Sequence, residues 1–132
     1  MDLMNLKPTS DTVEVILRHP QTGETVNNED GSEMTITVYA PHSKEYKAAL
    51  YKQTNKRIKA ASKKGRTEIT AEEIETSALT LLSEVVKDWD ITYGGEKPKL
   101  TLTKVREVFT EVFWIKDQVE EAVATTEFFT QV

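Results

Sequence analysis

The chain has 132 residues, no cysteine and a net charge of −5. This length favours a single domain, residues 1–132, with a core large enough to need no covalent cross-links. Without cysteine the chain forms no disulfide, thiolate nucleophile or cysteine-ligated zinc site, and its acidic balance argues against non-specific nucleic-acid binding. The first residues lack the features of a signal peptide, and no apolar run approaches the ~20 residues of a membrane span.

Positive and negative charges are distributed unevenly along the chain. Residues 43–66 carry nine basic residues and one glutamate, which gives this segment a charge of +8 and leaves −13 for the rest. A basic segment on an acidic body favours electrostatic contacts between neighbouring copies of the protein.

Residues 12–40 are predicted to form an antiparallel β-hairpin. Apolar and polar residues alternate in TVEVILR (12–18) and MTITVYA (34–40), and the connection between them is rich in turn-forming residues. The apolar residues expected to face the core are Val13, Val15, Leu17, Met34, Ile36 and Val38. Because two strands alone are marginal, the hairpin is expected to lie on helices or to pair with another molecule.

Residues 43–64 are predicted to form a long basic helix with Ser43 as its N-cap. Its apolar residues form a thin stripe that is interrupted at 53–57. The helix is therefore expected to lie at the surface or to project from it.

Residues 70–130 are predicted to form a helical core. Its first helix, 71–88, begins with a capping box of Thr70 and Glu73, bracketed by Ile69 and Ile74 as a hydrophobic staple. A short helix at about 104–112, capped by Thr103, and a final helix complete the unit. The residues expected on the buried helix faces are Ile74, Ala78, Leu81, Leu82, Val85, Trp89, Val105, Val108, Phe109, Val112, Ile115, Val119, Ala122 and Val123. The predicted fold is α+β and mostly helical: an N-terminal hairpin, a long basic helix and a three-helix C-terminal unit.

No group of residues has the spacing of a catalytic or metal site. His19 and His42 each neighbour a proline and have no third metal ligand at a suitable spacing, so they are interpreted as turn or surface residues. The Gly94-Gly95 pair lacks the lysine and hydroxyl residue of a phosphate loop, which indicates a turn. We therefore expect no enzymatic activity, no cofactor and no bound metal.

The candidate contact residues are basic and aromatic. The basic helix could meet nucleic-acid phosphates or the acidic face of a neighbouring copy, and the second is favoured because the chain itself supplies that face. Phe128 and Phe129 either pack back onto the core or face a partner. The residues predicted to contact a partner or a second copy are Lys52, Lys56, Arg57, Lys59, Lys63, Trp114, Phe128 and Phe129.

Two regions of the chain resemble a known family. In the first, HPQTGE (19–24) follows a strand, and MTITV (34–38) and SKEYK (43–47) come next. In the second, a helix ends at Trp89, a glycine-containing loop leads to Leu102-Thr103, and a short helix precedes WIKDQV (114–119) and a closing aromatic pair. In this order and spacing, over about residues 12–129, the chain resembles the tail assembly chaperones of long-tailed, non-contractile (siphovirus-type) bacteriophages. It departs from their pattern at Asp88, where a glycine before Trp89 is expected, and at Phe113, where proline is frequent.

The resemblance implies a non-catalytic assembly factor in the cytoplasm of the host cell. Such a protein coats the tape measure protein, keeps it soluble, promotes tail tube polymerisation around it and is absent from the mature virion. The implied partners are the tape measure protein and, through a longer frameshifted product, the tail tube protein; no membrane contact is implied. The uneven charge adds head-to-tail self-association as an expectation. The alternative drawn from the residues is a nucleic-acid-binding regulator that uses the basic helix, residues 43–66.

Overall fold

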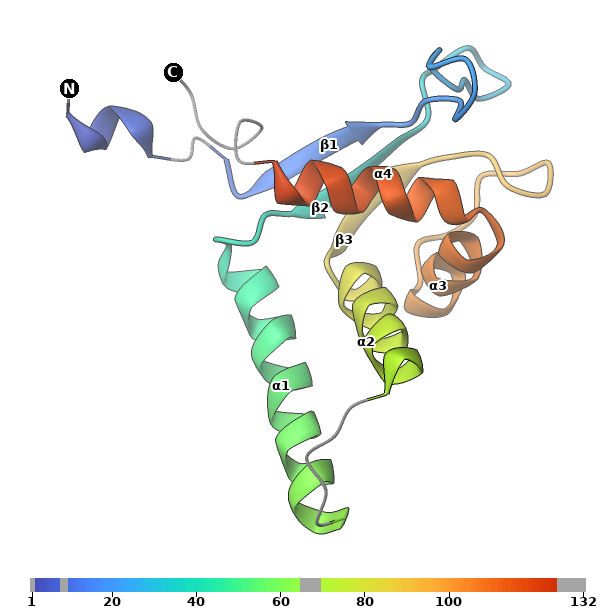
Figure 1. Ribbon diagram of the computed structural model, residues 1–132. Helices are drawn as coiled ribbons and strands as arrows, with labels where there is room; N and C mark the ends of the chain where they lie inside the picture. The colour runs from blue at the N-terminus through green and yellow to red at the C-terminus, as the bar shows by residue number, and fades with distance from the viewer. Residues whose placement is uncertain (1, 8–9, 65–69, 126–132) are drawn as a thin grey trace.

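The computed structural model describes residues 2–7, 10–64 and 70–125 (Figure 1). Within these ranges it contains a three-stranded antiparallel sheet of order β1-β2-β3, four α-helices and a short 3₁₀ helix. In chain order the elements are the 3₁₀ helix Leu3–Leu6, β1 (Thr12–Ile16), β2 (Thr35–Tyr39), α1 (Lys44–Lys64), α2 (Ala71–Glu84), β3 (Val86–Asp90), α3 (Leu102–Glu111) and α4 (Phe113–Ala124). The α+β class is confirmed, although about half of the chain, rather than most of it, is helical.

The strands β1 and β2 form the predicted hairpin. Val13 lies opposite Val38 and Val15 lies opposite Ile36 in an antiparallel register. The predicted inward-facing residues of β1, together with Leu17, Ile36 and Val38, are all buried. Strict alternation over two β-branched segments was therefore sufficient to identify this part of the core.

The third strand is a correction to the predicted first core helix. We expected a helix over 71–88, but α2 ends at Glu84 and the next residues pair with β2. Val38 lies opposite Val86 and Thr37 opposite Asp88, so Lys87 is an extra residue that makes a β-bulge. The bulge interrupts the alternation by which a strand is recognised in a sequence. The segment becomes a strand because it satisfies the backbone groups on the second edge of β2.

The start of α2 is less buried than its pattern predicts. Thr70 caps the helix as expected, since its Oγ1 accepts a hydrogen bond of 3.1 Å from the backbone N–H of Glu73. Ile74 is nevertheless 56% exposed and Ala78 is also exposed, whereas Leu82 and Val85 are buried. Only the C-terminal half of the predicted apolar face therefore reaches the core. The proposed staple with Ile69 lies outside the described residues.

The last two helices follow the predicted pattern with a different cap. Thr101, rather than Thr103, is the N-cap of α3, because its backbone is extended and its Oγ1 accepts from the N–H of Lys104 at 3.1 Å. Val112, expected on the buried face of this helix, is instead its half-buried C-cap residue. The fully buried residues of α3 and α4 include Val105, Val108, Phe109 and Val119.

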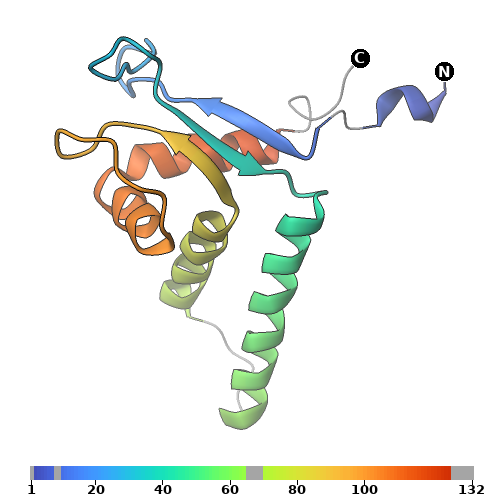
Figure 2. The ribbon, with the colours of Figure 1, turned by 180° about the vertical axis from the view of Figure 1, so that it is seen from behind.

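One face of the sheet is covered by helix and the other is open. α4 crosses one face of the sheet, and α3 packs beside its first turns (Figure 1). Viewed from behind, the opposite face of β1 and β2 is covered by none of the described helices (Figure 2). α1 and α2 extend together away from the sheet in both views. This arrangement leaves the outer half of α1 without a core beneath it.

Candidate interaction surface on α1 and α2

An apolar cleft lies where α1, α2 and α4 meet. It has a volume of about 440 Å³ and is lined by Pro41, Tyr46, Ala78, Leu81, Leu82, Glu120, Val123 and Ala124. Seven of these eight residues present mainly apolar groups to the cleft. Ile74 continues the α2 wall one turn away, and Leu50 continues the α1 wall with 37% of its surface exposed. We refer to the cleft together with Ile74 and Leu50 as the apolar cleft.

The cleft stays open because α1 and α2 have few large apolar residues to place between them. A side-chain hydrogen bond joins the two helices: Gln53 Nε2 donates to the backbone oxygen of Ser77 at 2.7 Å. At the base of the cleft, partial burial raises the pKa of the Tyr46 hydroxyl. A tyrosine hydroxyl is neutral at physiological pH, so the ring contributes apolar surface to the cleft.

One face of α1 carries a line of lysines, on a different side of the helix from Tyr46 and Leu50. Lys52, Lys56 and Lys59 are exposed and fall at i, i+4 and i+7, so they share one side of the helix. Lys63 continues the same line in sequence, but its side chain lies outside the described part. We call these four residues the basic stripe; over eleven residues of helix it spans about 17 Å. Arg57 is exposed on a different side of α1.

The cations of the basic stripe are not neutralised within the described part of the chain. The described ion pairs join His42 to Asp11, Lys97 to Asp30 and Asp90, Lys104 to Glu107, and Lys116 to Glu120. None of them includes Lys52, Lys56, Arg57 or Lys59. An acidic surface of another molecule could therefore pair with these cations without breaking an ion pair among the described residues.

Of the predicted aromatic contact residues, Trp114 lies apart from the basic stripe. Trp114 is half-buried and packs against the core in the first turn of α4, at the end near α3 and away from α1. Its neighbour Phe113 is 65% exposed. Phe128 and Phe129 lie outside the described residues, so their contact with a partner stays a prediction.

The histidines and the glycine pair occupy turns, as the sequence indicated. His19 Nδ1 accepts hydrogen bonds from the N–H groups of Gln21 and Thr22 at 3.1 and 3.4 Å. His42 Nε2 lies 3.1 Å from the backbone oxygen of Ser10 and 3.2 Å from Asp11 Oδ1. Gly94 and Gly95 both have positive φ, 67° and 83°, as a tight I′-type turn requires. Over the residues that the structure describes, no three His, Asp or Glu side chains cluster as metal ligands would.

A polar cluster that the sequence did not indicate joins the β1–β2 connection to the segment after β3. Asp30 accepts from the Oγ and N–H of Ser32 at 2.6 and 2.9 Å and pairs with Lys97 at 3.0 Å. The pKa of Asp30 is held well below its usual range, mainly by the hydrogen bonds from Ser32 and to a lesser extent by the contact with Lys97. The same ion pairs raise the pKa of Lys97. This cluster joins the two loops through hydrogen bonds and ion pairs.

The low pKa of Asp30 predicts an acid-dependent loss of stability. A carboxylate with a depressed folded-state pKa contributes stability above its unfolded pKa of about 4, and this contribution is lost as the pH falls towards the folded value. The difference in unfolding free energy between the natural protein and Asp30→Asn should therefore shrink between about pH 5 and pH 2. Urea unfolding at several pH values, with an NMR titration of the carboxyl carbon, measures it. A carboxyl group that titrates near 4 would contradict the prediction.

Comparisons of the chain with models of protein families, with curated proteins and with solved structures found no match. In the ranges 2–7, 10–64 and 70–125, no helix has both the length and the apolar character needed to cross a membrane. The apolar cleft and the basic stripe are therefore the features that a functional proposal must explain.

Proposed function

We propose that this protein is a tail assembly chaperone of a siphovirus-type phage. It coats the tape measure protein in the host cell cytoplasm, keeps it soluble and promotes tail tube polymerisation around it. It acts without catalysis or a cofactor and leaves before the virion matures. The observation that carries this proposal is the open apolar cleft. Lys52, Lys56 and Lys59, on another side of α1 and without an ion-pair partner in the described part of the chain, support it.

The cleft has the character of a site for an amphipathic helix. Helix-in-groove recognition places residues at i, i+3, i+4 and i+7 of one helix into an apolar groove between others. A tape measure protein is expected to be a long helix whose apolar stripe has no core until the tube encloses it. Tyr46, Leu81 and Ile74 would cover such a stripe.

Coating a long client requires many copies that are each held weakly. A domain of 132 residues is roughly 30–40 Å across, so at about 1.5 Å per residue each copy covers on the order of 25 helical residues. Weak individual contacts allow the tube subunits to displace the coat, and multivalency supplies the retention. A longer frameshifted product would bring the tail tube protein to this complex.

The coat would be stabilised by head-to-tail contacts between copies. The basic stripe of one copy faces an acidic surface of the next, for which the first two turns of α2 and the exposed side of α4 provide Glu72, Glu75 and Asp117. Such heterologous contacts do not close on themselves, so they build an open spiral that suits a rod-shaped client.

Co-expression with the tape measure protein tests the proposal. The tape measure protein should become soluble and co-purify, and Ile74→Asp should abolish this because it places a charge in the apolar cleft. Ile74 is 56% exposed, so this variant should keep its fold. The matched control is Leu102→Asp, which changes an aliphatic residue that is 46% exposed at the start of α3. If the tape measure protein stays insoluble, or if both variants behave alike, the proposal is wrong.

Self-association should weaken at high salt and on reversal of the basic stripe. Three exposed ion pairs contribute roughly 1–3 kcal/mol together, so Lys52→Glu, Lys56→Glu and Lys59→Glu combined should weaken head-to-tail association roughly 10- to 100-fold. Light scattering over a range of protein and salt concentrations measures the mean mass. A mass that is the same at low and high salt over the whole concentration range would rule out head-to-tail contacts of this kind.

The spacing of the basic stripe also supports the second candidate, a nucleic-acid-binding regulator. Lysines at i, i+4 and i+7 give one helix face several phosphate contacts. A gel shift at physiological salt separates the two functions, because strong retention of nucleic acid is expected only of the regulator. Ile74→Asp should leave such retention unchanged.

A further inference from the structure

The outer edge of β1 is open over a short stretch. Leu17 N donates to Met34 O at 2.9 Å and Ala40 N donates to Asp11 O at 2.8 Å. In an antiparallel pair such bonds recur at every second residue, so the odd-numbered residues of β1 face β2. The N–H and C=O groups of the even-numbered residues therefore point away from the sheet.

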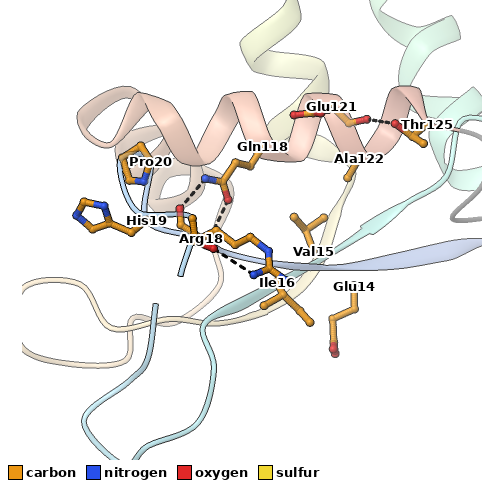
Figure 3. Close-up of a pocket in the computed structure, with 11 residues that line it drawn as sticks. Glu14, Val15, Ile16, Arg18, His19, Pro20, Gln118, Glu121, Ala122 and Thr125 are labelled. Atoms are coloured by element: carbon orange, nitrogen blue, oxygen red, sulfur yellow. Dashed lines mark hydrogen bonds between the residues drawn. The ribbon is translucent and has the colours of Figure 1, made fainter. Parts of the chain in front are cut away.

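Two side chains of the protein itself close the ends of this edge. Ser10 Oγ donates to the backbone oxygen of Thr12 at 2.9 Å and lies 3.1 Å from its N–H. At the other end, Gln118 Oε1 accepts from Arg18 N at 2.9 Å and Gln118 Nε2 donates to Arg18 O at 2.7 Å (Figure 3). The Gln118 amide thus occupies the place that a neighbouring strand would take.

Between these two closed ends, Glu14 and Ile16 have no hydrogen bond from their outward N–H and C=O groups within the described residues. A groove of about 550 Å³ runs along this stretch, with Val15 and Ile16 on one side and Glu121 and Ala122 of α4 on the other (Figure 3). Ile16 is 38% exposed, so its apolar side chain is accessible to a partner at this edge.

We infer that this edge binds a second copy of the chain, β1 against β1 in antiparallel orientation, with the two-fold axis at Val15. In this register Glu14 exchanges two hydrogen bonds with the partner's Ile16, and Ile16 exchanges two with the partner's Glu14. All four open groups of each copy are then satisfied, and the two sheets join into one. This dimer is independent of the proposed function.

The register is selected by the closed ends and by charge. A shift by two residues in one direction places Glu14 opposite the partner's Glu14, and like charges directly opposite are destabilising. A shift in the other direction requires the backbone groups of Arg18, which Gln118 already occupies. In the central register Glu14 lies diagonal to the partner's Arg18, within reach of long side chains. The Arg18 guanidinium is held at this edge by a 3.2 Å hydrogen bond to Gly23 O.

The same symmetry gives Glu121 a defined effect. Glu121 lines the groove from α4, so the two-fold axis brings the partner's Glu121 to the same groove. The two carboxylates repel each other and weaken the dimer. Glu121→Gln should therefore lower the dissociation constant, whereas removal of a contact residue would raise it.

Sedimentation equilibrium from micromolar to near-millimolar protein tests the dimer. It is best done in the Lys52→Glu, Lys56→Glu, Lys59→Glu background, which removes the proposed head-to-tail contacts and should leave this dimer intact. Ile16→Pro removes an outward N–H that makes no bond within the monomer, so it should raise the dissociation constant at least tenfold and keep the far-UV circular dichroism. A dimer that survives Ile16→Pro would overturn the inference.

A charge exchange tests the register even if Ile16→Pro fails to fold. Glu14→Arg should weaken the dimer at least tenfold, and Glu14→Arg with Arg18→Glu should restore it. The matched control is Glu24→Arg, which makes the same change at an exposed residue of the β1–β2 connection. Failure of the double variant to recover would show that the two residues do not meet.

Amide hydrogen exchange identifies what covers the edge. The N–H groups of Glu14 and Ile16 should become protected as the protein concentration rises and the dimer forms. Protection of both groups in a species that stays monomeric would mean that another part of the same chain covers them, and would overturn the inference. A monomer at every concentration with both groups unprotected would overturn it as well.

Discussion

Replacing Phe109 with alanine is expected to lower the free energy of unfolding by about 3–5 kcal/mol. The ring is fully buried, with 0% of its surface exposed, and it belongs to the hydrophobic core cluster that also contains Val105, Val108 and Val119. Its removal costs the transfer free energy of the ring and leaves a cavity that the surrounding helices fill only in part. Because folded domains are stable by about 5–15 kcal/mol, this single change removes a large share of the total.

Urea unfolding followed by circular dichroism measures this loss. Phe113→Ala is the matched control, since Phe113 begins the next helix and is 65% exposed; we expect a change within about 0.5 kcal/mol. A loss of similar size in both variants would mean that the packing of α3 against α4 differs from that described.

Asn28→Ala is expected to lower the free energy of unfolding by about 2–3 kcal/mol, at the upper end of the cost of unsatisfied buried polar groups. Asn28 is 4% exposed although it lies in the β1–β2 connection. Its Nδ2 donates to Ser32 Oγ at 3.1 Å and to Asp90 Oδ1 at 3.3 Å, and its Oδ1 accepts from Thr92 Oγ1 at 2.6 Å. Alanine would leave the Thr92 hydroxyl without its acceptor and detach the connection from β3.

The neighbouring Asn27→Ala provides the control for this second prediction. Asn27 is exposed, and none of the described side-chain hydrogen bonds involves it. Its substitution should change the unfolding free energy by no more than about 0.5 kcal/mol. Equal effects at the two positions, measured by urea unfolding, would show that burial and hydrogen bonding of Asn28 are not what stabilises the connection.

The parts of the fold that could be predicted from the sequence are those with a local cause. Alternation of β-branched residues predicted the hairpin, and threonine or serine before an apolar pattern predicted the starts of α1 and α2. The third strand could not be predicted in this way, because the bulge at Lys87 hides its alternation and its stability comes from β2, distant in sequence. The choice of Thr101 over Thr103 as a cap depended on the backbone conformation of the preceding loop.

The candidate surfaces divide in the same way. The basic helix is a local feature, so its lysines were predicted, and Lys52, Lys56 and Lys59 are exposed. The apolar cleft is formed by residues of three helices and depends on how those helices are placed, which no local pattern contains. Ile74 was expected in the core and instead borders the cleft. One local signal for the β1 edge was present, because Ile16 is an apolar residue on the side of the strand that otherwise carries Glu14 and Arg18.

The amide of Gln118 has a consequence for how the protein avoids aggregation. Sheets with an exposed edge recruit further strands, and proteins limit this with short edges and blocking side chains. Here the side-chain amide of Gln118 on α4 makes the two hydrogen bonds that a neighbouring strand would make. The part of the edge that is open to further strands therefore ends at Arg18. The length over which this sheet can grow is thus governed by a residue one hundred positions away in the chain. Substitutions at that site would alter solubility at high concentration before they alter the fold.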